Sequence, residues 1–129
     1  MKKLIVIALM LFGLVSNVSA GSAPAAYAWE VLDIYSSSVP NGEYVYGSQT
    51  STSQNHNGEM IFRVLVKGYS STVVSTYNNQ ALAPFQIDGI DANGDGFYDM
   101  WLYYYYVPSM TSGYINVQDF GTRDSIYVK

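Results

Sequence analysis

The sequence contains no cysteine, so it cannot form disulfide bonds or carry a lipid anchor on a thiol. Charged residues are also scarce, at 12% of the chain, and only 6 are Lys or Arg against 10 Asp or Glu. Two of the six cations, Lys2 and Lys3, belong to the leader described below. A protein that binds a nucleic-acid backbone needs a basic patch, and the remaining four cations are too few to form one. We therefore expect no nucleic-acid partner.

Long apolar runs are missing as well, apart from one short run near the N-terminus. A charged start precedes apolar residues 4–15, and Val18 and Ala20 complete a Val-x-Ala site, which is the layout of a secretory signal peptide. The apolar run is too short for the roughly 30 Å hydrocarbon core of a membrane, so we expect no membrane span. Residues 1–20 then direct secretion, and cleavage near Ala20 leaves an extracellular or periplasmic protein.

The rest of the chain, residues 21–129, has the length of one domain. It contains all 13 tyrosines, which favour strands because the tyrosine ring fits a half-buried pleated surface. The sequence has no amphipathic helix long enough to connect parallel strands. We therefore predict a single all-β domain, mostly antiparallel, in the form of a small β-sandwich or an open barrel. Residues 21–26 are small and aperiodic and are expected to form a flexible lead-in.

Alternating apolar residues and turn signals locate the strands. The clearest strand covers residues 60–67, where every second side chain from Met60 to Val66 is apolar and is expected to face the core. Further strands are predicted over residues 27–35, 43–48, 98–107, 113–120 and 125–128. Pro108 and Gly113 are expected to bracket a turn, and residues 69–83 are expected to be irregular with room for one short helix.

The densest chemistry in the sequence is an acidic, glycine-rich loop between two of these strands. Its oxygen-bearing residues fall at positions one, three, five, seven and nine of a calcium loop: Asp91, Asn93, Asp95, Phe97 through its carbonyl, and Asp99. Gly94 and Gly96 permit the left-handed backbone that such a loop needs. We predict that the five residues bind Ca²⁺ in a structural role. The alternative is that Asn93-Gly94 and Asp95-Gly96 are metal-free turn dipeptides.

Residues 91–99 resemble the calcium loops of dockerins, thrombospondin repeats and especially FG-GAP repeats, in which Asp-x-Asn-Gly-Asp-Gly-x-x-Asp precedes an apolar strand. Dockerins and EF-hands place an acidic ligand at position twelve, where this chain has Leu102. A helix–loop–helix site is therefore not expected. The resemblance implies a strand–loop–strand site whose coordination is completed by water or by Asp88.

Four consecutive tyrosines, Tyr103 to Tyr106, follow this loop and point alternately to the two faces of a strand. Trp101 shares the face of Tyr103 and Tyr105. Such a row of rings can stack against sugars, or it can be buried, with one face in the core and the other packed by a facing strand. The uncharged segment would aggregate at the edge of a sheet, so we expect it in a sheet interior.

A second cluster would support catalysis instead of binding. His56, Glu59 and Arg63 combine an imidazole, a carboxylate and a guanidinium, which together can perform acid–base chemistry in a small secreted hydrolase or toxin. His56 is the only histidine and lies in a polar loop, where a solvated side chain without a catalytic role is the competing interpretation. The sequence has no other recognisable catalytic motif.

Three segments carry a resemblance that extends over most of the chain after the leader: Lys67-Gly-Tyr-Ser70, Asn79-Gln-Ala-Leu-Ala-Pro84 and Asp124-Ser-Ile-Tyr-Val128. Together with the signal peptide, they resemble the YolA-like family of small secreted bacterial proteins of unknown function. The resemblance implies secretion from a bacterium and one β-rich domain, and it implies no activity.

These observations predict a secreted, calcium-binding β-domain that acts as a binding module for a glycan or a cell-surface protein. Two alternatives stay open. One is the small hydrolase or toxin that uses His56, Glu59 and Arg63, and the other is a secreted inhibitor or structural protein whose partner is another protein.

Overall fold

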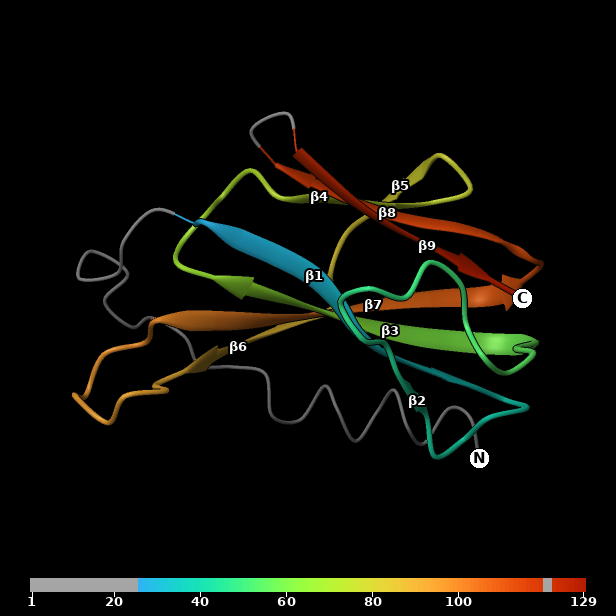
Figure 1. The fold of residues 1–129 in the computed structure, drawn as a ribbon, viewed down its shortest axis with the longest axis horizontal. Helices are drawn as coiled ribbons and strands as arrows, with labels where there is room; N and C mark the ends of the chain where they lie inside the picture. The colour runs from blue at the N-terminus through green and yellow to red at the C-terminus, as the bar shows by residue number, and fades with distance from the viewer. Residues whose placement is uncertain (1–25, 120–121) are drawn as a thin grey trace.

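The computed structural model describes residues 26–119 and 122–129. Within these ranges the chain forms nine strands and no helix (Figure 1). The strands are β1 (Ala28–Ser36), β2 (Glu43–Tyr44), β3 (Gly58–Lys67), β4 (Val74–Tyr77), β5 (Gln80–Leu82), β6 (Gln86–Ile90), β7 (Met100–Met110), β8 (Gly113–Asp119) and β9 (Thr122–Val128). The predicted signal peptide and most of the predicted lead-in lie outside the described residues.

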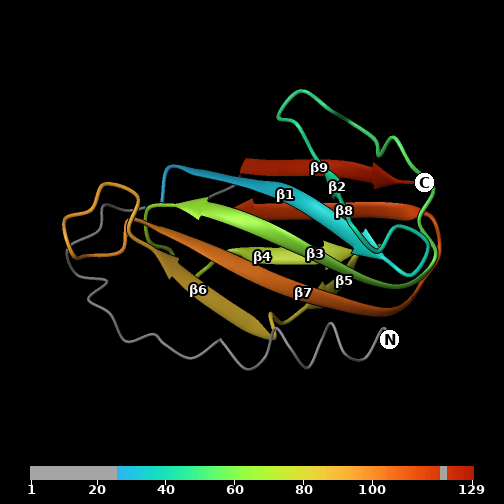
Figure 2. The same cartoon turned by 90° about the horizontal axis from the view of Figure 1, so that it is seen from below.

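The strands form two antiparallel sheets that lie as two layers (Figures 1 and 2). The larger sheet has the order β2-β1-β3-β7-β6, and the smaller sheet has the order β5-β4-β8-β9. Neither sheet closes on itself, so the structure is a sandwich and not a barrel. The prediction of an all-β, antiparallel fold is confirmed. In the part of the chain that is described, no helix has the length and apolarity needed to cross a bilayer.

One apolar core fills the space between the sheets. In β3, every second residue from Met60 to Val66 faces inward and is at most 1% exposed, as the alternating pattern predicts. Phe62 stacks on Tyr105 of the neighbouring strand, with 5.0 Å between ring centroids. The smaller sheet contributes Tyr77, Ile115, Val117, Ile126 and Val128 to the same core. Burial of each large apolar side chain stabilises the fold by about 1.5–3 kcal/mol.

The strand β1 contains an irregularity that turns one acidic residue outward. Its pairing with β3 shifts between Val31 and Asp33. Val31 and Ile34 therefore both face the core, whereas Asp33 lies on the outer face beside Arg63. The neighbouring strand β2 is only two residues long and covers only the C-terminal part of β1. The N-terminal part of β1 therefore forms an open edge of the larger sheet.

Residues 69–83 differ from the prediction of an irregular segment with a short helix. They contain the hairpin β4–β5, whose turn residues Asn78 and Asn79 have φ angles of 50° and 66°. Asparagine tolerates this left-handed conformation, which a two-residue hairpin turn requires. The prediction was wrong because the few apolar residues in so short a run fit a strand or a helix equally well.

Two strand boundaries also differ from the prediction. The expected turn at Pro108 lies inside β7, which continues to Met110. The pairing of β3 with β7 shifts between Gly58 and Met60, so β7 has an extra residue there, and proline is tolerated where the ladder is interrupted. The strand predicted over residues 43–48 is reduced to β2, because contact with β1 ends at Val45, whose N–H donates to the carbonyl of Leu32.

Candidate functional site

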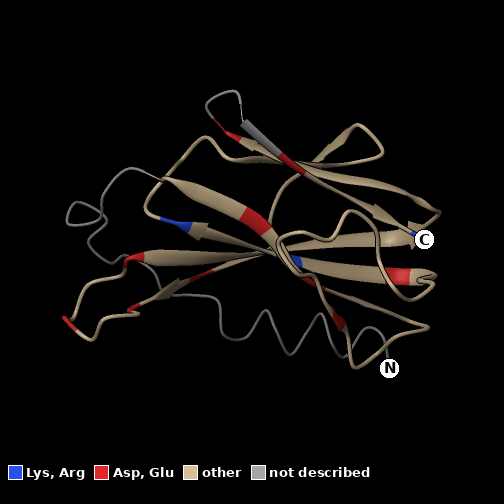
Figure 3. Ribbon diagram, viewed as in Figure 1, with Lys and Arg blue, Asp and Glu red and all other residues tan. Residues whose placement is uncertain are grey.

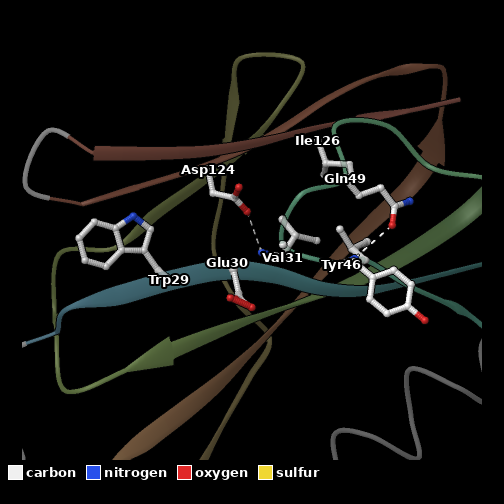
Figure 4. Close-up of a pocket in the computed structure, with 9 residues that line it drawn as sticks. Trp29, Glu30, Val31, Tyr46, Gln49, Asp124 and Ile126 are labelled. Atoms are coloured by element: carbon white, nitrogen blue, oxygen red, sulfur yellow. Dashed lines mark hydrogen bonds between the residues drawn. The ribbon is translucent and has the colours of Figure 1, made fainter.

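A pocket opens on the side of the sandwich, between the open edge of β1 and the strand β9 (Figure 4). Its volume is about 190 Å³. Nine residues line it: Trp29, Glu30, Val31, Val45, Tyr46, Gly47, Gln49, Asp124 and Ile126. Because these residues come from β1, β9 and the segment after β2, the pocket joins both sheets and one loop.

The pocket exists because β2 leaves the edge of β1 uncovered there. β2 pairs with β1 only at Asp33 and Ile34. The backbone N–H of Val31 turns instead to the second sheet and donates a hydrogen bond of 3.1 Å to Oδ2 of Asp124. This bond ties β9 to β1 and holds a carboxylate in the wall of the pocket.

Aromatic and amide side chains form the two ends of the pocket. Figure 4 shows the indole of Trp29 at one end and Tyr46 with Gln49 at the other. Tyr46 is 67% exposed, and its ring meets that of Tyr44 edge to face at 5.9 Å. The amide of Gln49 is held in place, because its Oε1 accepts the N–H of Tyr46 at 3.1 Å and its Nε2 donates to the carbonyl of Ser51 at 2.8 Å.

The lining offers contacts that could hold a ligand. Aromatic rings cover apolar surface, while a carboxylate and an amide exchange hydrogen bonds with hydroxyl groups. The lining contains no His, Ser, Thr, Cys or Lys. Glu30 and Asp124 are its two carboxylates, and Figure 4 shows them on opposite sides of the β1 backbone. They do not face each other across one space, as the acid pair of a glycosidase does.

The acidic loop, residues 91–99, connects β6 to β7 and accepts hydrogen bonds from its own backbone. Oδ1 of Asp91 accepts the N–H of Gly94 at 2.8 Å and that of Asp95 at 3.2 Å. Oδ2 of the same residue accepts the N–H of Gly96 at 2.8 Å. These bonds, the one from Gly96 most of all, lower the pKa of Asp91 against a smaller opposing effect of desolvation.

The other predicted calcium ligands face backbone groups in the same way. Oδ1 of Asn93 accepts the N–H of Asp95 at 3.2 Å, and Oδ1 of Asp95 accepts that of Phe97 at 2.9 Å. Oδ1 of Asp99 accepts the N–H of Ala92 at 2.9 Å. Over residues 26–119 and 122–129, no three His, Cys, Asp or Glu side chains gather as a metal site requires. The loop is thus a series of side-chain-to-backbone turns.

The tyrosine-rich strand β7 lies between β3 and β6, in the interior of the larger sheet, as predicted. Tyr105 is in the core, and Tyr103 packs against the core. Tyr104 and Tyr106 lie on the outer face, and each donates its hydroxyl hydrogen to a carboxylate of that face. Each of the four side chains therefore has a contact within the fold.

His56, for which a solvated position was the competing interpretation, is only 4% exposed. Its Nδ1 lies 2.8 Å from Oγ of Ser36, and its Nε2 lies 3.0 Å from Oε1 of Glu43. The same carboxylate accepts the backbone N–H groups of Ser53 and Gln54. A hydroxyl, an imidazole and a carboxylate in series resemble a hydrolase triad, with the two ring nitrogens exchanged. However, Ser36 is itself buried, so the cluster fastens the loop to the sheet and leaves no access for a substrate.

The structure does not bring together the three residues of the predicted hydrolase site. Each has a different partner: His56 contacts Glu43, whereas Glu59 accepts the hydroxyl hydrogen of Tyr106. Arg63 forms two hydrogen bonds to Asp33, at 2.8 and 2.5 Å. The three side chains therefore act as separate structural contacts of the sheet and its connecting loop.

The fold and its pocket define an all-β protein of two antiparallel sheets with a side pocket between them. The chain belongs to the family described as a domain of unknown function (DUF4879), whose model matches residues 21–127. No curated protein and no solved structure matches the chain. Membership of this family assigns no activity, so a function has to be argued from the pocket and its surroundings.

Sequence reasoning did not find the pocket, because Trp29, Tyr46 and Asp124 are far apart in the chain and belong to different strands and loops. One signal could have indicated it. Asp124 lies two residues before Ile126, on the inward face of a strand. A carboxylate in an inward-facing row needs a hydrogen-bonding partner or an opening to solvent, and here it has both.

Proposed function

We propose that the protein is an exported binding module that holds a neutral carbohydrate in the pocket between β1 and β9. The observation that supports this proposal most is the set of side chains around one pocket: Trp29, Tyr46, Gln49 and Asp124. A sugar has an apolar ring face and hydroxyl groups at its edge, and this lining offers a contact for each. The pocket is smaller than the roughly 300–1,000 Å³ of drug-sized sites, which suits about one sugar ring.

The charge of the lining favours a neutral, hydroxyl-rich ligand over other classes. Glu30 and Asp124 would repel a phosphate or an acidic sugar, because no Lys or Arg lines the pocket. A purely apolar ligand would displace water from Asp124 without replacing its hydrogen bonds, which is costly. A neutral sugar avoids both penalties.

Export is part of this proposal, since polysaccharides are accessible outside the cell. It is supported by the leader over residues 1–20, and the family match begins at residue 21, directly after the predicted cleavage point. The resemblance to YolA-like proteins agrees with export and stays a prediction. The intact mass of the protein recovered from the medium after expression of the full chain tests cleavage near Ala20.

The binding proposal is tested by calorimetric titration with soluble oligosaccharides derived from cellulose, chitin, xylan and starch. We expect one of these to bind, and Trp29→Ala to weaken its binding about tenfold or more, since loss of an aromatic contact at a binding centre typically exceeds 1 kcal/mol. Asp124→Asn, which keeps an acceptor for Val31, is expected to weaken binding less. Phe97→Ala is the matched control, because Phe97 is an aromatic residue 47% exposed in the distant loop.

Two results would contradict the binding proposal. Failure of all four oligosaccharide series to bind would remove the carbohydrate as ligand. Equal affinity of the wild type and Trp29→Ala for the oligosaccharide would show that the ligand binds outside the pocket. Urea unfolding of each variant has to match the wild type for either result to count.

We further propose that Ca²⁺ orders the loop 91–99. The support is its donor set of hard oxygens at alternate positions, which comprises Asp91, Asn93, Asp95, the carbonyl of Phe97, and Asp99. The left-handed φ angles of Gly94 and Gly96, 79° and 92°, already give the loop a tight curve. Because no three acidic side chains gather in the described residues, binding requires some of these side chains to rearrange.

Calcium binding is tested by calorimetry and by the melting temperature with and without Ca²⁺. A bound ion at about 100 times its Kd stabilises the folded state by about 2.7 kcal/mol. We expect this increase in the wild type and not in Asp95→Ala, and a smaller one with Mg²⁺. The absence of both binding heat and a shift in melting temperature would establish the loop as a metal-free turn.

A further inference from the structure

The outer face of the smaller sheet is a second surface, distinct from the pocket. Alternate residues of β4, β8 and β9 face away from the core there: Val74, Thr76, Tyr114, Asn116, Gln118, Ser125 and Tyr127. They stand in register across the three strands, with Asn116 between Thr76 and Ser125. We call these seven residues the neutral face.

None of the seven side chains of the neutral face carries a charge. Figure 3 shows charged stretches along β1, β3 and β6 of the larger sheet and none along β4 or β5 of the smaller sheet. The acids of β8 and β9 do not belong to this face, because Asp119 is buried and Asp124 lines the pocket. At one end of the neutral face, the register position opposite Gln118 is held by Arg123. The centre of the face therefore presents hydroxyl and amide groups without the attraction or repulsion that charges would add.

Tyr114 and Tyr127 provide an aromatic contact on this face. Their rings meet edge to face, with 5.0 Å between centroids, and Tyr114 is 52% exposed. Beside them, Oγ of Ser125 donates to Oδ1 of Asn116. This bond fixes the amide oxygen of Asn116 and leaves its two N–H groups to serve as donors to a ligand. A ring and a fixed amide on one flat surface match the two kinds of contact that a sugar chain makes.

The neutral face is continuous with the pocket through β9. Side chains alternate along a strand, so Asp124 lines the pocket while Ser125 and Tyr127 lie on the neutral face. Near its C-terminal end the edge of β9 is covered by two backbone hydrogen bonds: the N–H of Tyr127 donates to the carbonyl of Thr50, and the carbonyl of Tyr127 accepts the N–H of Thr52. A ligand that spans both surfaces therefore crosses β9 near Asp124.

We propose that the neutral face docks an uncharged polysaccharide chain, one unit of which occupies the pocket. This inference rests on the proposed function and identifies its ligand as a polymer. An interface with another protein would be expected to have a more apolar centre, whereas Val74 and the tyrosine pair are the only apolar groups here. Contacts of one chain with two linked surfaces raise the affinity, because the second contact forms at a high effective concentration.

The test uses suspensions of insoluble cellulose, chitin, xylan and starch together with the short oligosaccharide of the pocket experiment. We expect Tyr114→Ala to weaken retention on the polymer about tenfold while leaving the affinity for the short oligosaccharide unchanged. Tyr114→Phe, which keeps the ring, is expected to be retained nearly as well as the wild type. Trp29→Ala should weaken both interactions, and Phe97→Ala should weaken neither.

The outcomes separate this inference from the pocket proposal. If Tyr114→Ala is fully retained on the polymer while binding of the oligosaccharide depends on Trp29, the neutral face is not a docking surface, and the pocket proposal is unaffected. If retention on the polymer depends on Tyr114 but no oligosaccharide binds, the pocket does not hold a sugar unit, and the proposal that one chain occupies both surfaces is wrong. Failure of all four polymers to retain the wild type overturns the inference. Self-association in sedimentation that Tyr114→Ala abolishes would assign the face to a second copy of the chain and overturn it as well.

Discussion

The two sheets present different outer surfaces. Across the larger sheet, one row of neighbouring residues runs through all five strands: Tyr44, Asp33, Arg63, Tyr104 and Gln86. Its three central members contact one another, because Arg63 pairs with Asp33 and lies over the ring of Tyr104, 5.6 Å from its centroid. Arg63 also lies over the ring of Tyr35, 5.7 Å from its centroid. On the neutral face of the smaller sheet the polar groups are uncharged, and they are more open to solvent than the buried Asp33 is.

This difference separates two uses of polar side chains. A group that binds a partner in the same molecule stabilises the fold, and its loss leaves that partner unsatisfied. A group that faces water can exchange the water for a ligand at little cost. Substitutions in the paired row should therefore reduce stability, whereas substitutions in the neutral face should change binding and leave stability intact.

The largest expected effect is the loss of the acid at the centre of the paired row. Asp33→Ala leaves Arg63, whose side chain is only 24% exposed, without its two hydrogen bonds, so we expect a loss of about 3 kcal/mol in the free energy of unfolding. Urea denaturation measures it. Adding Arg63→Met should recover part of the loss, because the double variant contains no unpaired charge. A loss below about 0.5 kcal/mol for Asp33→Ala would mean that the row is not stabilising.

A smaller and pH-dependent effect is expected at the buried carboxylate of Glu43. Burial raises its pKa, but hydrogen bonds from Ser53, His56 and Gln54 outweigh this effect, so the pKa lies below the ordinary value of 4.5. Its stabilisation is therefore complete above that value and is lost as the pH falls through the lowered pKa. Glu43→Gln should reduce stability at neutral pH by about 1–2 kcal/mol and flatten the acid limb of the stability curve. Parallel acid limbs in the two proteins would contradict this.

The alkaline limb should depend on three tyrosines. The pKa is raised to about 12 for Tyr77 and Tyr103, mainly by burial, and for Tyr106, mainly by its hydrogen bond to Glu59. A raised tyrosine pKa stabilises the fold fully below the ordinary value of 10.0, and this stabilisation is lost as the pH rises toward the raised value. Absorbance of the phenolate should show a late step near pH 12, and Tyr106→Phe should reduce that step by one tyrosine. If Tyr106→Phe left the size of the absorbance step near pH 12 unchanged, Tyr106 would not be one of the tyrosines that titrate in that step.

The sequence was sufficient to predict the all-β fold and its clearest strands, because alternation over residues 60–67 and the tyrosine surplus follow directly from the geometry of a sheet with one buried face. It was not sufficient for the sites. The pocket depends on the early end of β2 and on a hydrogen bond between Val31 and Asp124, which are 93 residues apart. The burial of His56 depends on partners that no local pattern identifies. The spacing of acids in the loop 91–99 satisfies both a calcium site and a chain of turns, so spacing alone cannot separate the two.

The smallest change in stability is expected for a substitution on the neutral face, and it tests most directly whether the two outer surfaces differ in role. Ser125→Ala removes one hydroxyl that donates to Asn116 in a partly exposed position, where water can replace it, so stability should stay within about 0.5 kcal/mol of the wild type. Retention on the polymer should nevertheless weaken about two- to fivefold, because the amide of Asn116 loses its fixed orientation. Unfolding and retention measured on the same preparations as Asp33→Ala make the contrast direct. If Ser125→Ala destabilised the protein as much as Asp33→Ala does, the neutral face would belong to the internal network of the fold, and the distinction between a stabilising and a binding surface would not hold.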